Sequence, residues 1–581
     1  MATLNLVQFS GEIPRMIPRL LPESAAQRAE NVRLDNGALT PVRAARLAQN
    51  VTGLDAGTIQ TIYKHGDTWL AWDKVVHAAP GPVAQDRLYY TGDGAPKMRV
   101  DGAVYPLAVP YPSAAPVLTI GGSGSGNVTT SGYVYTFVTD FGEESEPSAI
   151  SNLADWQAGQ TRTLSGIQAA PAGRNITKQR FYRSQSGQTS GSDLFFIAER
   201  AASAADFIDG IALPDLGEVL PSREWNAPPD GLRGLISLPN GMMAGFVGKD
   251  LYFCEPYRPH AWPESYVLTM DYPIVALGAY GTTIVVATSG NPYLVAGSAP
   301  ENMQQEKLEL NLPCINARGL VDLGYAVAYP SNDGLVVASG GGAKVATDVL
   351  MTRNDWLKTS PASFVAGQFN GRYFASYEYL EADGTPSRGT FIIDLSGSMP
   401  FILRASRYAQ ACFYDLPSGA LYMLDGVGIY EFDAFGQVNE IMTWHSKQFI
   451  LPAPSSYGCI KIDANDKLTP EQIVAREAER EAAAARNAIT FAQPSIGGEI
   501  NGAAFNVHPV NGDQLERLQE AQFTSVNVYA DSVLVANVTE VNRVVRLPAV
   551  QKAHAWEVTV NGTAEIAQIA LAGTPRELNG F

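Results

Sequence analysis

The feature that most constrains this 581-residue chain is a strand–turn–strand pattern that recurs through its middle. Between Asp230 and Asp433, short apolar runs alternate with turns rich in Gly, Asn and Asp, as in "MMAGFVGKDLYFCEP" and "SFVAGQFNGRYFASYEY". Five glycines, spaced 33 to 53 residues apart, mark the turns: Gly248, Gly281, Gly334, Gly371 and Gly419. This spacing is near that of propeller blades, so we expect a mainly β fold containing a β-propeller, with stacked β-sandwiches as the alternative.

Two further β regions precede this pattern. Residues 58–112 alternate apolar and polar residues around His65-Gly66-Asp67 and Gly92-Asp93-Gly94, which predicts hairpins that supply further propeller strands. Residues 113–226 contain a glycine-serine stretch, an aromatic strand and the turn "GEESEPS". This order is similar to that of fibronectin type III modules, so we expect an immunoglobulin-like or fibronectin-III-like sandwich inserted between blades.

One long helix is predicted after the repeats, in "TPEQIVAREAEREAAAARNAI". Thr469 suits the N-cap and Pro470 the first helical position. The apolar face is thin, with Ile473, Val474 and a row of alanines, so the helix gains little stability alone. We expect either an exposed surface helix or one that lines a subunit boundary.

The C-terminal residues are predicted to be β again. From residue 523, apolar and polar residues alternate with period two, and Trp556, Val558 and Val560 should share one face. The chain then divides into six expected segments: N-terminal arm and platform strand (1–57), first propeller strands (58–112), sandwich insert (113–226), propeller blades (227–435), platform strands with the long helix (436–500) and a C-terminal β-sandwich module (501–581).

The charge and cysteine content restrict partners and compartment. A formal net charge of −17 argues against a nucleic-acid grip, which needs concentrated Lys and Arg. The four cysteines show no CxxC spacing, which favours buried thiols over a disulfide framework. No apolar run approaches the roughly 20 residues that span a bilayer. Prolines interrupt any apolar stretch near the N-terminus, which predicts no signal peptide and synthesis as a soluble cytosolic protein.

A search for chemistry finds no catalytic constellation. Phosphate-loop and nucleophile-elbow motifs are missing from the sequence, and we expect no enzyme activity, no cofactor and no metal site. The acidic cluster Asp140, Glu143, Glu144 and Glu146 lacks the alternating ligand order of a calcium loop, so a solvated turn is the preferred interpretation over calcium binding. The stretch "CEPYRPHAWP", residues 254–263, is interpreted as a packed loop, with a carbohydrate platform as the alternative.

The N-terminal stretch "GEIPRMIPRLLPESAAQRAENVRLDNGALTPVRAAR" is punctuated by prolines and rich in arginine. Each proline removes a backbone donor and pushes the preceding residue toward extended conformations, so residues 11–21 cannot form one regular helix. The following "ESAAQRAENVR", residues 23–33, is predicted to be a short helix. We expect this arm to be a tether laid on a surface, either of a neighbour or of its own subunit.

The arm also carries a resemblance. The order Gly11, Pro14, Pro22, Ala26, Asn31, Gly37, Leu39 and Arg43 is similar to the start of short-tailed bacteriophage tail nozzle proteins, the tubular tail proteins below the portal and adaptor. The stretches "FCEPYRPHAWP" and "WEVTVNG…IALAGTPREL" resemble phage virion proteins more weakly. The resemblance implies a virion tail protein with a platform region, a propeller and a tip. It also implies a six-fold ring bound to the adaptor, attachment of tail fibres or a tail spike, and passage of double-stranded DNA without tight binding.

Three groups of residues follow as candidates if the resemblance holds. The assembly arm, toward the adaptor or a neighbouring subunit, comprises Pro14, Arg15, Arg19, Pro22, Asn31, Arg33, Gly37 and Arg43, whose arginines suit bidentate pairs with carboxylates. The subunit-boundary helix presents Ile473, Val474, Arg476 and Glu479. The candidate acidic lumen or tip loop is Asp140, Glu143, Glu144 and Glu146, because acidic side chains in a bore would repel DNA.

Two other functions stay open from the sequence. One is a receptor-binding or glycan-degrading propeller of a virion, which predicts an aromatic, carboxylate-rich pocket and a trimer. The other is a non-viral propeller scaffold, which predicts a monomer.

Overall fold

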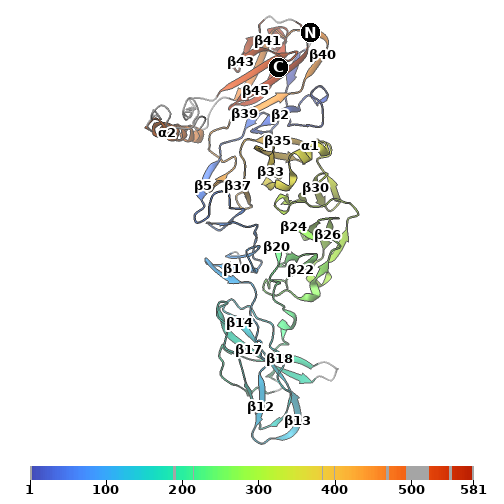
Figure 1. Cartoon of the computed structure of the whole chain (residues 1–581), viewed down its shortest axis with the longest axis vertical. Helices are drawn as coiled ribbons and strands as arrows, with labels where there is room; N and C mark the ends of the chain where they lie inside the picture. Colours follow the sequence, from blue (N-terminus) through green and yellow to red (C-terminus); the bar gives the residue numbers. More distant parts are fainter. Residues whose placement is uncertain are drawn as a thin grey trace. The chain divides into compact units, whose positions relative to one another are not determined.

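The computed structural model describes residues 3–84, 86–186, 192–212, 215–381, 384–397, 399–465, 470–492, 523–548 and 552–578. The chain divides into two compact units. Unit 1 comprises residues 1–62, 332–336 and 345–581, and unit 2 comprises residues 63–331 and 337–344. Both are mainly β, as the sequence predicted (Figure 1).

The largest sheet of unit 1 has ten strands and joins distant parts of the chain. Its order is β32 (Val365–Phe369), β33 (Arg372–Leu380), β34 (Pro386–Asp394), β35 (Phe401–Ala405), β2 (Ala26–Glu30), β39 (Met442–Ser446), β45 (Ala553–Gly562), β42 (Thr524–Ala530) and β43 (Val533–Val538), with β40 (Phe449–Ser455) also paired to β45. Trp556, Val558 and Val560 of β45 are fully buried on one face, which confirms the prediction from period-two alternation.

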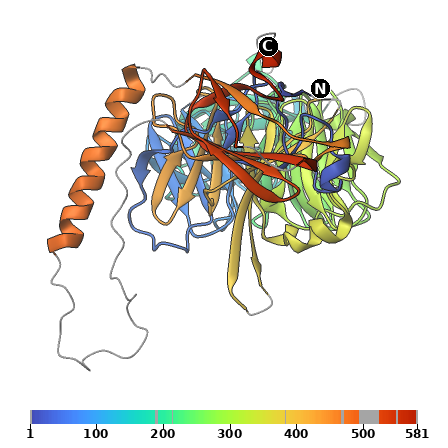
Figure 2. The same ribbon diagram turned by 90° about the horizontal axis from the view of Figure 1, so that it is seen from above.

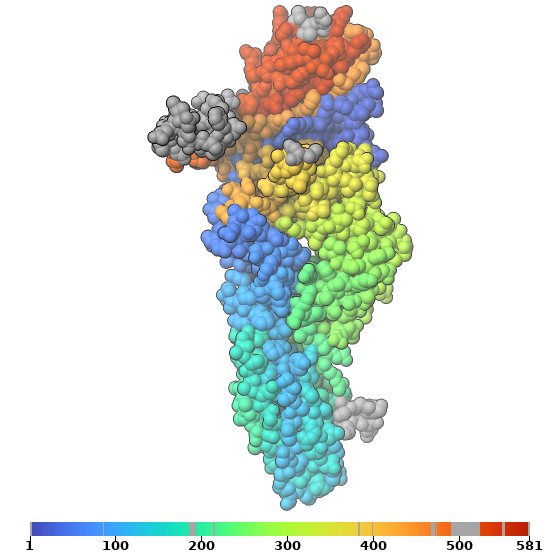
Figure 3. Space-filling model, viewed as in Figure 1, coloured from blue at the N-terminus to red at the C-terminus, as the bar shows by residue number. Residues whose placement is uncertain are grey.

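Three smaller sheets also lie in the described part of unit 1. They are β1 (Leu4–Leu6), β46 (Glu565–Ala572), β41 (Cys459–Asn465) and β44 (Val544–Arg546); β36 (Ala411–Asp415), β37 (Ala420–Asp425), β38 (Gly428–Glu431) and β5 (Arg46–Asn50); and β3 (Val32–Arg33) with β4 (Thr40–Pro41). Strands near the two ends of the chain, β1 and β46, are thus paired, and Figure 3 shows N-terminal residues, dark blue, beside C-terminal ones, orange and red. The expected segments 1–57, 436–500 and 501–581 therefore share sheets and one hydrophobic core.

The predicted helix over residues 23–33 is wrong. Residues Ala26–Glu30 form strand β2, which pairs antiparallel with β39 through Ala29 and Trp444. Ala26 and Ala29 are almost fully buried between neighbouring strands. Pairing with a strand more than 400 residues away overrides the local helix preference of alanine, glutamine and glutamate.

Four sheets of four antiparallel strands recur between residues 77 and 345. They are β8 (His77–Pro80), β9 (Arg87–Thr91), β10 (Lys97–Val100) and β11 (Ala103–Pro106); β20 (Arg233–Ser237), β21 (Met243–Val247), β22 (Asp250–Phe253) and β23 (Leu268–Thr269); β24 (Ile274–Tyr280), β25 (Thr283–Thr288), β26 (Tyr293–Ala296) and β27 (Gln304–Lys307); and β28 (Val321–Asp322), β29 (Val327–Ser331), β30 (Gly334–Ser339) and β31 (Gly342–Val345). A two-stranded sheet joins β6 (Thr61–His65) and β7 (Thr68–Trp72). The predicted hairpins are confirmed here, and Gly248 and Gly281 turn with φ of +61° and +57°.

The remaining strands of unit 2 lie between residues 113 and 226. One sheet has the order β12 (Val117–Gly121), β16 (Thr161–Ser165) and β19 (Phe207–Asp209), and another β14 (Tyr133–Thr139), β17 (Ile176–Ser186) and β18 (Ser192–Ala201). A two-stranded sheet pairs β13 (Ser125–Ser131) with β15 (Ala154–Ala158). Tyr133, Tyr135 and Phe181 pack in the core of this region.

The described helices are few. The α-helices are α1 (Arg353–Lys358), α2 (Pro470–Ala492) and α3 (Pro575–Leu578), and short 3-10 turns include η1 (Pro18–Leu20). Helix α2 confirms the predicted long helix, and Figure 2 draws it as one unbroken coil. Thr469, the predicted N-cap, lies outside the described residues.

Candidate functional site

The N-terminal arm enters the large sheet of unit 1 at Gly11 and Glu12. The amide of Glu12 donates to the carbonyl of Ile402 at 2.8 Å, and Ile402 donates back at 3.0 Å. On the other side, the amide of Ala26 donates to the carbonyl of Gly11 at 3.0 Å. These two arm residues therefore bridge β35 and β2 where the strands diverge. A Cβ on Gly11 would lie 2.6 Å from the carbonyl oxygen of Ile402, so only glycine fits this approach.

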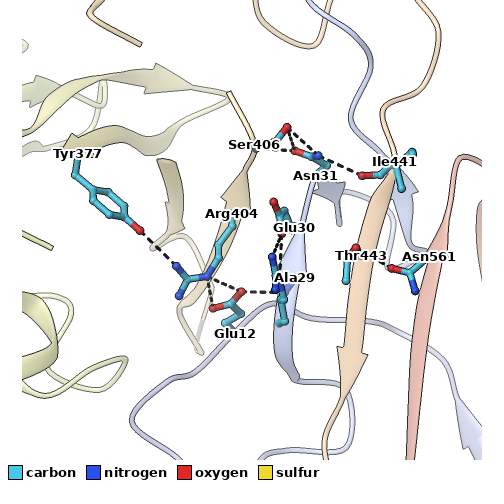
Figure 4. Close-up of polar contacts among 11 residues, drawn as sticks. Glu12, Ala29, Glu30, Asn31, Tyr377, Arg404, Ser406, Ile441, Thr443 and Asn561 are labelled. Atoms are coloured by element: carbon cyan, nitrogen blue, oxygen red, sulfur yellow. Dashed lines mark hydrogen bonds and ion pairs between the residues drawn. The ribbon is translucent and has the colours of Figure 1, made fainter. Parts of the chain in front are cut away.

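The Glu12 carboxylate fixes the arm electrostatically. Figure 4 shows it between Arg404 and the backbone of Ala29. Nε of Arg404 donates to its two oxygens at 3.0 and 2.9 Å, and the amide of Ala29 donates at 2.9 Å. Burial raises the pKa of Glu12, against the opposing influence of Arg404 and the Ala29 amide. Sequence reasoning missed Glu12, and its only local signal is that it is the first acidic residue of the chain.

A second anchor joins the arm to Asp433. Arg43 donates to Asp433 from its amide at 2.8 Å and from Nε and Nη2 at 3.1 Å each. Arg33 Nη1 lies 3.4 Å from the same carboxylate, whose side chain is 5% exposed. Burial lowers the pKa of Arg33, with Asp433 opposing the shift. The expected pairing of these two arginines with a neighbouring subunit is therefore corrected, because both pair within their own chain.

Asn31 and Gly37 also form hydrogen bonds within unit 1. Asn31 adopts φ of +54° and donates to Ser406 Oγ at 3.0 Å and to the carbonyl of Ile441 at 3.2 Å. Gly37 turns with φ of +82° and accepts a hydrogen bond from the amide of Phe9 at 2.8 Å. The second half of the predicted assembly arm, which contains Asn31, Arg33, Gly37 and Arg43, thus forms contacts within its own subunit.

The first half of the arm is different, because seven consecutive residues from Pro14 to Leu20 are exposed. We call this segment the arginine loop. Its flanks, Ile13 and Leu21, are buried, and its backbone is held by hydrogen bonds to Leu350 and Gln448. Three large apolar side chains nevertheless face solvent: Met16, Ile17 and Leu20, which are 41%, 47% and 68% exposed. Pro14, Arg15 and Arg19, predicted as assembly residues, belong to this loop, and Pro22 follows it at partial exposure.

Helix α2 also presents an exposed face. At about 100° per residue, ten exposed positions cover roughly 160° of its circumference. They are Glu471, Ile473, Val474, Glu477, Ala478, Glu481, Ala484, Ala485, Ala488 and Ile489, which we call the Glu477 face. Val474 and Ile489 are 71% and 64% exposed. The predicted boundary residues Ile473 and Val474 lie on this face.

The other predicted residues of the helix, Arg476 and Glu479, lie outside the Glu477 face. Glu479 pairs with Arg486 at 2.8 Å instead of projecting beside Val474. Glu477 and Glu481 were missed as candidates, although the 3.6-residue period of a helix places them beside Val474.

The predicted acidic lumen or tip loop is corrected in part. Glu143 and Glu144 are 5% and 2% exposed and pair with Arg174 at 2.6 Å and Arg180 at 2.8 Å. Buried, paired carboxylates cannot line a bore, nor do they form a solvated turn. Their partners lie 31 and 36 residues further along the chain, so the short acidic motif gave no sign of this pairing.

The outer members of the acidic cluster are less buried. Asp140 is exposed, whereas Glu146 is half-buried and accepts a hydrogen bond from Asn226 Nδ2 at 2.9 Å. Burial raises the pKa of Glu146, with Asn226 opposing the shift. Within the described residues, no group of three His, Cys, Asp or Glu side chains could hold a metal ion.

The cysteines and the aromatic loop are mostly internal. Cys254, Cys314 and Cys459 are buried thiols and Cys412 is partly exposed. Burial raises the pKa of Cys254 and of Cys314 to about 12, which disfavours a reactive thiolate. In the "CEPYRPHAWP" loop Trp262 is 1% exposed, in keeping with a packed loop. No helix in the described part of the chain is long and apolar enough to cross a membrane.

Comparisons with known proteins identify no family for this chain. No protein-family model and no curated protein matches this chain. Among solved structures, the N-terminal domain of Nup159 aligns at 8% identity with a TM-score of 0.23, covering 48% of this chain and 71% of that one. PorZ, a surface component of the type-IX secretion system of Porphyromonas gingivalis, aligns at 10% identity and a TM-score of 0.21, over 65% and 43%. The extracellular domain of BT4673 from B. thetaiotaomicron aligns at 8% identity and 0.20, over 78% and 49%. These TM-scores are too low to support an argument about fold or function.

Proposed function

We propose that this chain is a structural subunit of a short-tailed bacteriophage tail, a homo-hexameric nozzle below the portal and adaptor. In this role it forms a conduit for double-stranded DNA and an attachment point for tail fibres or a tail spike, and it acts in the virion after synthesis in the host cytoplasm. The resemblance of the N-terminal residues to nozzle proteins motivates the proposal. Its net charge of −17 suits a wall that DNA passes without tight binding.

One observation carries the assembly role: the arginine loop stays exposed although both of its ends are anchored. Anchoring at Glu12 and at Leu21 limits the conformations of the loop, so docking it costs little further entropy. Exposed large apolar side chains grouped in one segment are typical of protein interfaces. A second exposed apolar surface, the Glu477 face of α2, gives the subunit a further contact region.

We also propose that the four-stranded sheets are blades of a β-propeller. The four sheets of four strands found between residues 77 and 345, and the sheet of β36, β37, β38 and β5, are antiparallel and of blade size. In the last of these, β5 comes from the N-terminal region and completes a sheet of later strands, as the closing strand of a propeller does. Residues 113–226, with two three-stranded sheets, would form the immunoglobulin-like insert.

The assembled particle tests this function. We expect electron microscopy and mass measurement of the full chain, alone and with the adaptor of the same virion, to give a six-fold ring with a central hole. A trimer would favour a receptor-binding tail protein. A monomer that binds no adaptor would contradict the nozzle proposal and favour a separate scaffold.

A glycan-binding role is the second candidate, and one groove in unit 1 favours it. The groove has a volume of about 610 Å³ and is lined by Leu357, Lys358, Thr359, Ser360, Tyr377, Tyr379, Leu380 and Glu381. Tyr379 is partly exposed and stacks on the buried Tyr377 with ring centroids 6.2 Å apart, which leaves Tyr379 as the aromatic side chain for contact with a sugar ring. Glu381 is the one carboxylate lining this groove, so binding fits better than two-carboxylate hydrolysis. Glycan binding that disappears in Tyr379→Ala would support this candidate.

A further inference from the structure

We infer that the arginine loop of one subunit docks on the Glu477 face of α2 in a second copy of this chain. The inference rests on the proposed homo-oligomer and names two surfaces that would meet in it. The arginine loop then has one specific partner, the Glu477 face of another copy. The chemistry of the two surfaces supports this pairing.

The arginine loop is cationic in an acidic protein. From Ile13 to Pro22 the sequence holds Arg15 and Arg19 and no acidic residue. Both arginines are exposed beside the apolar side chains of Met16, Ile17 and Leu20. A fitting partner surface would therefore be apolar and carry carboxylates.

The Glu477 face of α2 has this composition. Its charged members are all acidic, namely Glu471, Glu477 and Glu481, and its apolar members include Ile473, Val474 and Ile489. Glu477 and Glu481 are four residues apart on a helix, so they are neighbours about 6 Å apart and one compact loop can reach both. The alanines between them allow a close approach of another backbone.

Charge and apolar area have different roles in this contact. Exposed ion pairs contribute little affinity individually, but opposite charges steer association and fix the register. The apolar side chains of both surfaces supply the area removed from water. Each subunit carries one arginine loop and one α2 helix. The cationic loop of one copy can therefore contact the acidic face of α2 in the next copy, and this contact can repeat between successive copies.

The two surfaces lie on different parts of unit 1. The loop is held beside Leu350 and Gln448, whereas the start of α2 lies near Gly436, where an added Cβ would be 3.6 Å from Cβ of Glu471. One subunit therefore presents both surfaces at once, and separate surfaces of this kind permit a heterologous contact between copies. Heterologous contacts close into rings when the rotation between subunits permits.

Charge reversal across the contact tests the inference with the full chain. We expect Arg15→Glu with Arg19→Glu to weaken self-association in sedimentation velocity about tenfold or more, and Glu477→Arg with Glu481→Arg to do the same. The quadruple variant, which restores opposite charges, should recover association to within about threefold of the wild type. Arg19→Glu alone is the second variant, because Arg15 also donates to the backbone carbonyl of Asp348.

Controls separate the contact from folding and from general electrostatics. Glu479→Arg with Arg486→Glu exchanges the charges of an ion pair on α2 that lies outside the Glu477 face and should leave association unchanged. Every variant should keep the wild-type unfolding transition. If both charge-reversal variants still formed rings with wild-type affinity, the inference would be overturned. It would also be overturned if the quadruple variant did not recover self-association. Neither result would contradict the nozzle proposal.

Other outcomes distinguish the inference from the proposed function. A reversal-sensitive assembly without six-fold symmetry would support the contact and contradict the hexamer. A wild-type chain that stays monomeric at all concentrations overturns the contact. Loss of adaptor binding on reversal of Arg15 and Arg19, with self-association intact, would assign the loop to the adaptor and also overturn it.

Discussion

The side chain of Glu12 meets that of Arg404 across 392 residues of sequence, with Nε of Arg404 at 3.0 and 2.9 Å from the two carboxylate oxygens. This contact places the start of the chain between two strands of the largest sheet. It also fixes one end of the exposed arginine loop, so the stability of the fold and the presentation of the loop depend on the same residue.

Replacing Glu12 by Ala should destabilise unit 1. The change leaves the buried amide of Ala29 without its acceptor and removes the partner of Arg404. We expect a loss of about 2–4 kcal/mol in the free energy of unfolding, measured with denaturant. Arg28→Gln breaks the exposed pair with Glu30 and serves as a control, with an expected loss below about 1 kcal/mol. Equal effects of the two changes would contradict a special role for Glu12.

The same carboxyl group predicts a pH dependence. The pKa of Glu12 is raised in the folded chain above 4.5, so the folded state binds this proton more tightly than the unfolded state. Its contribution to stability is then greatest at low pH and falls as pH rises from about 4.5 through the raised pKa. Glu12→Gln cannot titrate, so the stability of the wild type relative to this variant should decrease across that window and then stay constant. An increase with pH would contradict the raised pKa.

Gly11 is expected to tolerate no side chain. In Gly11→Ala the new Cβ would be 2.5 Å from Cδ2 of Phe401 and 2.6 Å from a carbonyl oxygen of the sheet. The backbone must shift to remove these clashes, so we expect a loss of about 1–3 kcal/mol in the free energy of unfolding. Gly397→Ala, where an added Cβ meets only ordinary contacts at 3.9 Å, should change it by less than about 0.5 kcal/mol.

Sequence reasoning succeeded where the information is local. The hairpin at Gly248, the long helix from Pro470 and the buried face of Trp556 follow from turn residues, capping and periodicity. Each of these signals lies within about 20 residues of the feature that it predicts.

Non-local pairing explains what the sequence did not reveal. Ala26 and Ala29 favour a helix locally but pair with Ser446 and Trp444 in a sheet. Asp433, about 400 residues further along the chain, pairs with Arg33 and Arg43, which the sequence analysis had assigned to contacts with a neighbouring subunit. The composition of the arginine loop was visible in the sequence, but its exposure between buried ends required the structure.

Asp433 should be a second anchor whose loss is costly. Asp433→Asn keeps the size of the side chain and tolerates φ of +52°, but it removes the charge that Arg33 and Arg43 share. Both arginine side chains are about one-fifth exposed, so we expect a loss of about 2–3 kcal/mol in the free energy of unfolding. Glu431→Gln, which breaks a pair with the more exposed Arg46, should cost less than about 1 kcal/mol.

Asp209 is expected to hold the 113–226 region of unit 2 together, because three buried groups converge on its Oδ2 atom. Arg183 Nη1 donates at 2.6 Å, Tyr133 donates from its hydroxyl at 2.7 Å, and Arg162 Nε lies at 3.4 Å.

The side chains of both arginines and of Asp209 are at most 5% exposed, so Asp209→Asn leaves two buried cations without a counter-charge. We expect a loss of about 3–5 kcal/mol in the stability of this region, seen as faster amide hydrogen exchange in β14 and β17. Asp155→Asn keeps an acceptor for Thr130 in an exposed pair and should leave exchange in those strands unchanged. Unchanged protection in Asp209→Asn would mean that the apolar core around Tyr135 and Phe181 holds these strands without the ion pairs.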